Sequence, residues 1–115
     1  MSETAANTSY KAGDFIFQKG EPGELMYIIK KGTVDIMLGE KLVETLGPDE
    51  FFGEMALIDN QPRSANAIAR TDCEIEAITA KRFQFRVQEM PFFAIKVMKV
   101  MAQRLRNTTE RSLGS

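Results

Sequence analysis

The sequence predicts one mainly β domain, a sandwich, jelly roll or small barrel, followed by two helices. Between residues 14 and 80 there are short apolar runs, and two further segments in which apolar and polar residues alternate. Alternation with a period of two is typical of strands with one buried face. Glycine and proline separate these runs at the intervals expected of turns. From residue 81 the apolar spacing changes to three and four, which indicates helices. A chain of 115 residues has the length of one domain.

The clearest strand signals come from four segments rich in aromatic, β-branched or alternating apolar residues: 15–17, 25–29, 34–38 and 73–77. Glycine-containing breaks follow at residues 31–32, 38–40 and 47–49, where hairpins or loops are expected. Many short strands with regular turn signals favour a β-sandwich, jelly roll or barrel.

Residues 51–61 interrupt the strand pattern. Gly53 is followed by a run of mostly good helix formers, and Asn60 and Pro62 end that run. We therefore expect an inserted helix of one or two turns. A connection between strands needs only two to five residues, so we expect this longer insertion to have a role besides joining two strands.

Two helices are expected at about 81–90 and 91–107. Pro91 suits the first turn of the second helix. Its polar residues fall on one narrow face, and apolar residues cover most of the rest. A helix with so wide an apolar arc usually packs against two partners. One would be the sheet, and the other a ligand, a lid contact or a second subunit.

The domain is expected to span residues 10–107. Residues 1–9 are polar and are expected to be a flexible N-terminus, and 108–115 a C-terminal tail. The chain contains no secretory leader pattern and no apolar run of membrane-spanning length, so a cytoplasmic location and no membrane contact are expected.

Composition excludes several kinds of active site. The chain has no histidine, which removes the usual general base and nearly all zinc, copper and non-haem iron sites. Its one cysteine, Cys73, cannot form an internal disulfide and is expected to face the core. No metal, no cofactor and no enzymatic activity are therefore expected.

The net charge of −1 is unevenly distributed: residues 1–57 carry −5 and residues 58–115 carry +4. The basic excess lies mostly between Lys81 and Arg106, where it could attract nucleic acid, anionic lipid or an acidic partner. A solvated helix face is the simpler interpretation, and the chain offers no DNA-reading element.

One group of residues around the inserted helix could hold an anion. Gly53 permits close approach to the first N–H groups of the helix, and a returning loop could bring Arg63, ten residues later, to the same place. Arg63 would offer a permanently charged, forked guanidinium to a phosphate, and Ser64 a hydroxyl donor. Glu54 could accept a hydrogen bond from a sugar hydroxyl. Each feature alone also fits an ordinary structural role. Together they suggest a pocket for a phosphorylated sugar.

At these residues the sequence resembles a known family. Residues 52–58, Phe-Gly-Glu-Met-Ala-Leu-Ile, and 62–65, Pro-Arg-Ser-Ala, are similar to the phosphate-binding cassette of cyclic nucleotide-binding domains. That family includes the ligand-binding domains of bacterial catabolite activators and of protein kinase A regulatory subunits. Further similarity covers nearly the whole chain, at residues 20–34, 71–75, 81–83, 101–105 and 108–110.

The resemblance implies an eight-stranded jelly-roll β-barrel with the short phosphate-binding helix inserted and two C-terminal helices. It also implies roles for individual residues. Glu54 would bind the ribose 2′-hydroxyl and Arg63 the cyclic phosphate. Ser64, with backbone groups of the segment that contains Phe52, Gly53, Met55 and Ala56, would complete the phosphate site. Thr108 and Thr109 match positions where the long helix offers hydroxyls to adenine.

The function implied is that of a cyclic nucleotide receptor, with cyclic AMP favoured and cyclic GMP possible, that signals through its C-terminal helix. The alternative is a degenerate jelly-roll domain that acts as a protein-interaction module. Expected partners are the nucleotide and either a second copy, through the C-terminal helix, or an effector protein; nucleic acid is not expected to bind this chain alone. The family's usual helix before the first strand would be short or missing. The chain would be a free-standing receptor or a fragment of a longer protein.

Overall fold

In a computed structural model the chain is mainly β, with two antiparallel sheets and, in the described residues, three helices. The structure describes residues 6–59 and 61–114. The described residues divide into two compact units, and the boundary between them lies between Arg82 and Phe83, within helix α2 (Ala80–Glu89).

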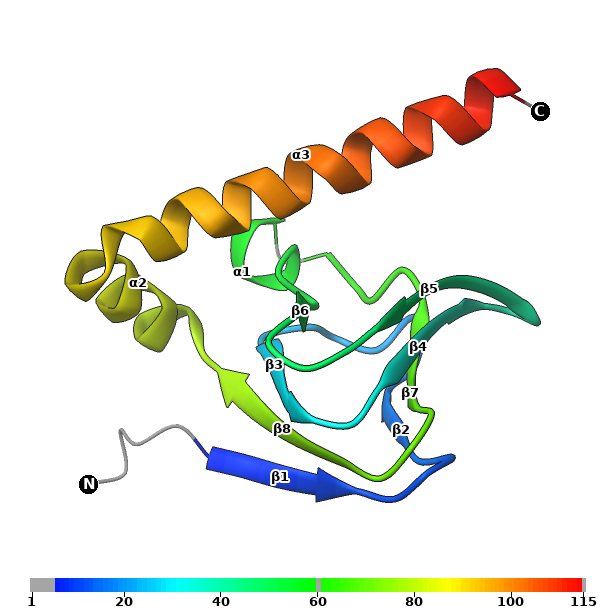
Figure 1. The fold of residues 1–115 in the computed structure, drawn as a ribbon, viewed down its shortest axis with the longest axis horizontal. Helices are drawn as coiled ribbons and strands as arrows, with labels where there is room; N and C mark the ends of the chain where they lie inside the picture. Colours follow the sequence, from blue (N-terminus) through cyan, green and yellow to red (C-terminus); the bar gives the residue numbers. More distant parts are fainter. Residues whose placement is uncertain (1–5, 60, 115) are drawn as a thin grey trace. The chain divides into compact units, whose positions relative to one another are not determined.

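Eight strands are found in the described residues, and they divide into two four-stranded sheets in the orders β1-β8-β3-β6 and β2-β7-β4-β5 (Figure 1). This pairing is that of a jelly roll, as predicted, although the two sheets stay separate and do not close into the expected barrel. The strands are β1 (Ala6–Tyr10), β2 (Phe15–Phe17), β3 (Met26–Lys31), β4 (Val34–Leu38), β5 (Lys41–Leu46), β6 (Phe51–Phe52), β7 (Asn66–Ala69) and β8 (Cys73–Ile78).

The core lies between the inward faces of the two sheets. Alternate residues of β3 and β8, such as Tyr27, Ile29 and Ile75, pack there against Val34 and Leu46 of the other sheet. Cys73 joins this core, as predicted, and its thiol lies 3.1 Å from the carbonyl oxygens of Thr33 and Thr71. Burial raises the pKa of that thiol, so it stays protonated.

Strand β1 was not predicted, because all of its residues except Tyr10 were expected to belong to a flexible N-terminus. It pairs antiparallel with β8, with Thr8 opposite Ile75 and Tyr10 opposite Cys73. Figure 1 shows it at the edge of its sheet. An edge strand is held by backbone hydrogen bonds and needs no apolar alternation, so a polar segment can occupy it.

The inserted helix α1 (Ala56–Asp59) has a single turn and lies between β6 and β7. A turn at residues 54–55 precedes it, and the Ala56 N–H donates to the Gly53 carbonyl at 3.3 Å. The predicted insertion is therefore present, but its regular part begins three residues after Gly53.

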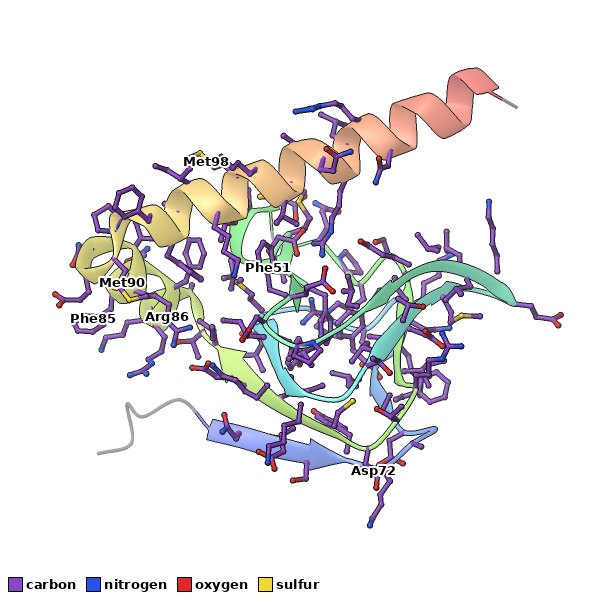
Figure 2. All side chains as sticks on the ribbon, viewed as in Figure 1. Phe51, Asp72, Phe85, Arg86, Met90 and Met98 are labelled. Carbon is purple, nitrogen blue, oxygen red and sulfur yellow. The ribbon has the colours of Figure 1, made fainter. Side chains whose placement is uncertain are left out.

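Helices α2 (Ala80–Glu89) and α3 (Pro91–Gly114) follow the strands. Thr79 Oγ1 accepts from the Arg82 N–H at 3.1 Å and so caps α2. In the second unit, the Phe83 and Phe93 rings meet edge to face at 5.7 Å, and Arg86 Cζ lies 5.5 Å from the Phe93 ring centroid. Figure 2 shows Phe85 and Arg86 on α2 and Met98 on α3.

Helix α3 begins at Pro91 as predicted but continues past the expected end at residue 107. The backbone of Thr108 and Thr109 is thus helical instead of lying in a tail, and their side chains fall outside the described residues. No glycine or proline interrupts the sequence between Pro91 and Gly114, and Gln103 Nε2 donates to Asn107 Oδ1 one turn later at 3.0 Å.

Candidate functional site

Arg63 is the centre of the candidate site. The chain leaves α1, passes Pro62 and is then attached by its backbone to the turn after β2. The Arg63 N–H donates to the Glu21 carbonyl, and the Gly20 N–H donates to the Arg63 carbonyl, both at 2.8 Å. These two hydrogen bonds fix where the Arg63 side chain starts.

The Arg63 guanidinium is held by backbone carbonyls and an aromatic ring. Nη1 donates to the Gly53 carbonyl at 3.2 Å, and Nη2 donates to the Leu25 carbonyl at 2.8 Å. Its Cζ lies 4.1 Å from the centroid of the Phe17 ring, within cation–π range. The predicted return of Arg63 to the start of the inserted segment is therefore present.

The charge of Arg63 is buried without a close counter-charge. The residue is 8% exposed, and its Nε–H is buried without a hydrogen-bond partner. Among the described residues, no carboxylate lies within ion-pair distance of the guanidinium. Desolvation is the largest influence on Arg63 and lowers its pKa, while Tyr27, Glu21 and Glu54 act in the opposite direction. A buried unpaired cation is unfavourable, and a bound anion would compensate it.

Gly53 permits the approach of the Arg63 guanidinium. Its φ of 77° lies in the left-handed region, which favours glycine. A Cβ atom at this position would lie 2.8 Å from Arg63 Nη1 and 3.3 Å from the Leu25 carbonyl oxygen. Both the backbone conformation and the space therefore require glycine here.

The remaining predicted site residues differ in their surroundings. Glu54 directly follows Gly53 and is 7% exposed, which is unusual for a carboxylate, and its charge is among the influences that raise the pKa of Arg63. Ala56 is buried, Met55 is 49% exposed and Ser64 is exposed. Phe52 stacks on Tyr27 at 5.2 Å, so its side chain belongs to the core and only its backbone remains for a ligand.

Three contacts of Arg63 were not predicted from the sequence. Phe17 was expected to be a strand residue, Gly23 a turn residue, and the Leu25 carbonyl carried no signal at all. A side chain that binds a backbone carbonyl 38 positions away leaves no local pattern in the sequence. The one available hint was the glycine-rich turn at Gly20–Gly23 before a buried strand.

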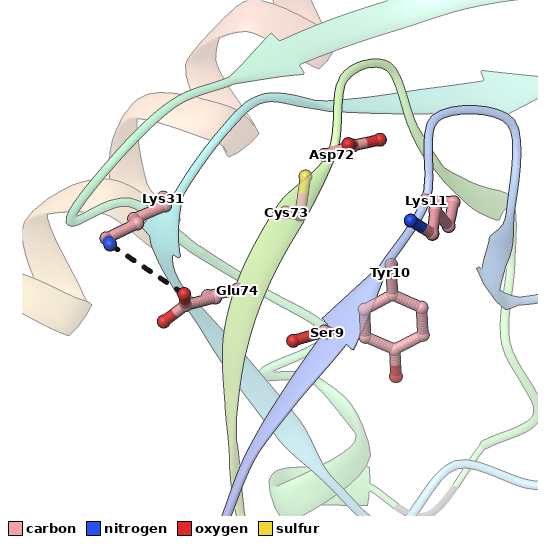
Figure 3. A pocket seen from close by; sticks show the side chains of 7 residues that line it. All are labelled: Ser9, Tyr10, Lys11, Lys31, Asp72, Cys73 and Glu74. Atoms are coloured by element: carbon pink, nitrogen blue, oxygen red, sulfur yellow. Dashed lines mark ion pairs between the residues drawn. The ribbon is translucent and has the colours of Figure 1, made fainter.

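A hollow of about 330 Å³ lies elsewhere, where β1 and β3 end and β8 begins (Figure 3). Its two lysines are balanced by two carboxylates, and Lys31 Nζ lies 3.7 Å from Glu74 Oε2. Asp72 Oδ1 accepts from the Ala12 N–H at 2.9 Å. This hollow offers an anion no net charge, unlike the Arg63 site.

Residues 7–89 match the family described as "Cyclic nucleotide-binding domain". The chain belongs to the cyclic nucleotide-binding domain family. The match includes the whole segment from Phe52 to Ser64, so the residues around Arg63 lie inside the family's domain. Domains of this family are regulatory and not themselves catalytic.

This cyclic nucleotide-binding domain has relatives of several kinds. It is 35% identical over 102 residues to the "Cyclic AMP receptor protein" of Thermus thermophilus, covering 84% of this chain and 47% of the relative. It is 36% identical over 120 residues to the "cGMP-dependent protein kinase" of Plasmodium berghei, covering 99% of this chain and 14% of the kinase. The chain thus spans less than half the length of these relatives.

Among solved structures, the cyclic nucleotide-binding domain resembles the Thermus thermophilus catabolite activator protein. The two align with a TM-score of 0.81 and 33% identity over 91% of this chain and 52% of the other. No helix among the described residues is both long and apolar enough to cross a membrane.

Proposed function

We propose that this domain is a receptor for a cyclic nucleotide and that Arg63 binds the cyclic phosphate. The observation that carries the proposal is the buried guanidinium of Arg63. Among the described residues, its Nε–H has no hydrogen-bond partner and no carboxylate lies within ion-pair distance of it. An anionic phosphate would satisfy both, and a guanidinium binds phosphate oxygens through short charge-assisted hydrogen bonds.

In this proposal the other residues of the site complete the ligand's environment. Glu54 accepts a hydrogen bond from the ribose 2′-hydroxyl, because a carboxylate is an acceptor and Glu54 lies next to Gly53. Ser64 and backbone groups from Gly53 to Ala56 contact the phosphate. We favour cyclic AMP over cyclic GMP as the ligand. Because the relatives include one named for each nucleotide, the two ligands are compared directly in the test below.

A thermal-shift panel tests the proposed function. A ligand at a hundred times its Kd adds about 2.7 kcal/mol to the free energy of unfolding. For a domain of this size, that raises the Tm by about 10 °C. We expect this shift with cyclic AMP, a smaller one with cyclic GMP, and none with 5′-AMP or ATP. A folded sample whose Tm responds to neither cyclic nucleotide would refute the proposal.

The role of Glu54 can be tested by pairing a variant with a ligand analogue. Glu54→Gln is expected to weaken cyclic AMP binding by about tenfold, because a hydrogen bond to a charged acceptor is replaced by a weaker one. The same variant should barely change the affinity for 2′-deoxy cyclic AMP, which lacks the hydroxyl. Calorimetric titration measures both. An equal loss for the two ligands would mean that Glu54 does not contact the 2′-hydroxyl.

We further propose that binding is signalled by movement of α3. The wide apolar arc of this helix favours two alternative packing positions, and a ligand shifts the population toward one of them. In one of these positions the hydroxyls of Thr108 and Thr109 would contact the base, and the helix would also offer a surface to a second copy or an effector. Hydrogen exchange with and without cyclic AMP should show added protection at residues 95–109 as well as 52–64. Protection confined to 52–64 would rule out this route.

A further inference from the structure

Gly23 lies against the guanidinium of Arg63. It is buried in the segment between β2 and β3, and its φ is not in the left-handed region. A Cβ atom at Gly23 would lie 2.9 Å from Arg63 Nε and 3.0 Å from Arg63 Cζ. The Ala56 Cβ would be 3.1 Å away. The space that a methyl group would need is therefore occupied by the guanidinium itself.

Arg63 cannot shift without losing the contacts that hold it. Its Nη1 and Nη2 are bonded to the carbonyls of Gly53 and Leu25, and the Phe17 ring packs against its Cζ. The side nearest Gly23 is the Nε side, whose N–H has no partner. A methyl group there would push the guanidinium off its carbonyls or cover the Nε–H.

We propose that Gly23 is a positioning residue for ligand binding: the absence of a side chain at this position lets Arg63 sit with its Nε–H available to an anion. This inference rests on the proposed function. It assigns to Gly23 a role that its backbone conformation does not require, since no positive φ demands glycine there.

The first test compares two glycine-to-alanine changes in the 115-residue chain by calorimetric titration with cyclic AMP. Gly47 is the matched control, because its φ is also ordinary and a Cβ there would meet only Glu50 Oε1, at 3.8 Å. Gly23→Ala is expected to weaken binding by about ten- to a hundredfold, which corresponds to the loss of one charge-assisted hydrogen bond. Gly47→Ala should bind like the wild type. Equal affinities for Gly23→Ala and the wild type would overturn the proposal.

The second test needs no ligand, so it separates this inference from the proposed function. Thermal denaturation is measured for the wild type, Gly23→Ala, Arg63→Ala and the double variant. If the methyl group collides with the guanidinium, Gly23→Ala lowers the Tm, or prevents folding, only while Arg63 is present. An equal drop in both backgrounds, or folding of neither Gly23 variant, would mean that something other than Arg63 excludes the methyl group and would overturn the inference.

Discussion

Arg63→Ala is expected to abolish measurable cyclic nucleotide binding and to leave the jelly roll folded. The change removes the charge proposed to bind the phosphate, and each charge-assisted hydrogen bond contributes about 1.5–3 kcal/mol. Two such bonds correspond to a loss of at least about a hundredfold in affinity. The fold should persist, because the change also removes a buried cation that forms no ion pair with any carboxylate in the described part of the chain.

Arg63→Lys serves as the charge-preserving control for this prediction. An ammonium cannot reach the carbonyls of Gly53 and Leu25 and the phosphate together, because it lacks the planar fork. We therefore expect little recovery of affinity in a calorimetric titration, with circular dichroism showing that both variants are folded. Binding of Arg63→Ala at nearly the wild-type affinity would mean that the guanidinium is not the phosphate ligand.

Gly32→Ala is expected to have the largest effect on stability. Gly32 follows β3, has a φ of 90°, and a Cβ atom there would collide with the carbonyl oxygen of Asp72 and approach Cys73 Sγ to 2.8 Å. Backbone cannot give way as a flexible side chain can. Left-handed strain costs roughly 1–2 kcal/mol, and the collision adds to it. Since a domain has only about 5–15 kcal/mol of stability, the variant should be largely unfolded.

Gly13→Ala separates strain from collision. Gly13 has a φ of 94°, close to that of Gly32, but a Cβ there would meet no atom within 4 Å. Urea denaturation should show a modest loss for Gly13→Ala and a much larger one, or no folded baseline, for Gly32→Ala. Similar losses of unfolding free energy for the two variants would mean that the start of β8 moves away from the added methyl group without destabilising the fold.

The strands that could be predicted are those whose burial leaves a pattern in the sequence. A continuous apolar run marks β3, and apolar alternation marks β4 and β8, because each strand has residues in the core. β1 was missed because an edge strand is held by its backbone, which no side-chain pattern records. The end of α3 was placed too early because polar ends resemble tails, although no helix breaker precedes Gly114.

The candidate site could be predicted only in part for a similar reason. Gly53, Glu54 and Arg63 lie within one short segment, so their spacing is visible in the sequence. Phe17, Gly23 and the Leu25 carbonyl reach the same guanidinium from a segment some 40 residues earlier. Their contribution depends on sheet pairing and on the absence of a side chain, and neither can be inferred from local residue types.

The central claim is that the Arg63 guanidinium binds the phosphate of a cyclic nucleotide, and its Nε–H is the most direct probe. In a chain labelled with ¹⁵N-arginine, the Nε–H signal of Arg63 is assigned as the one missing from the Arg63→Lys spectrum. Saturating cyclic AMP is expected to shift this signal strongly and to protect it from solvent exchange, because a buried unpartnered donor gains a charged acceptor. Adenosine, which has the same base and ribose but no phosphate, should leave it unchanged. An Arg63 signal that does not move while cyclic AMP is bound would contradict the account.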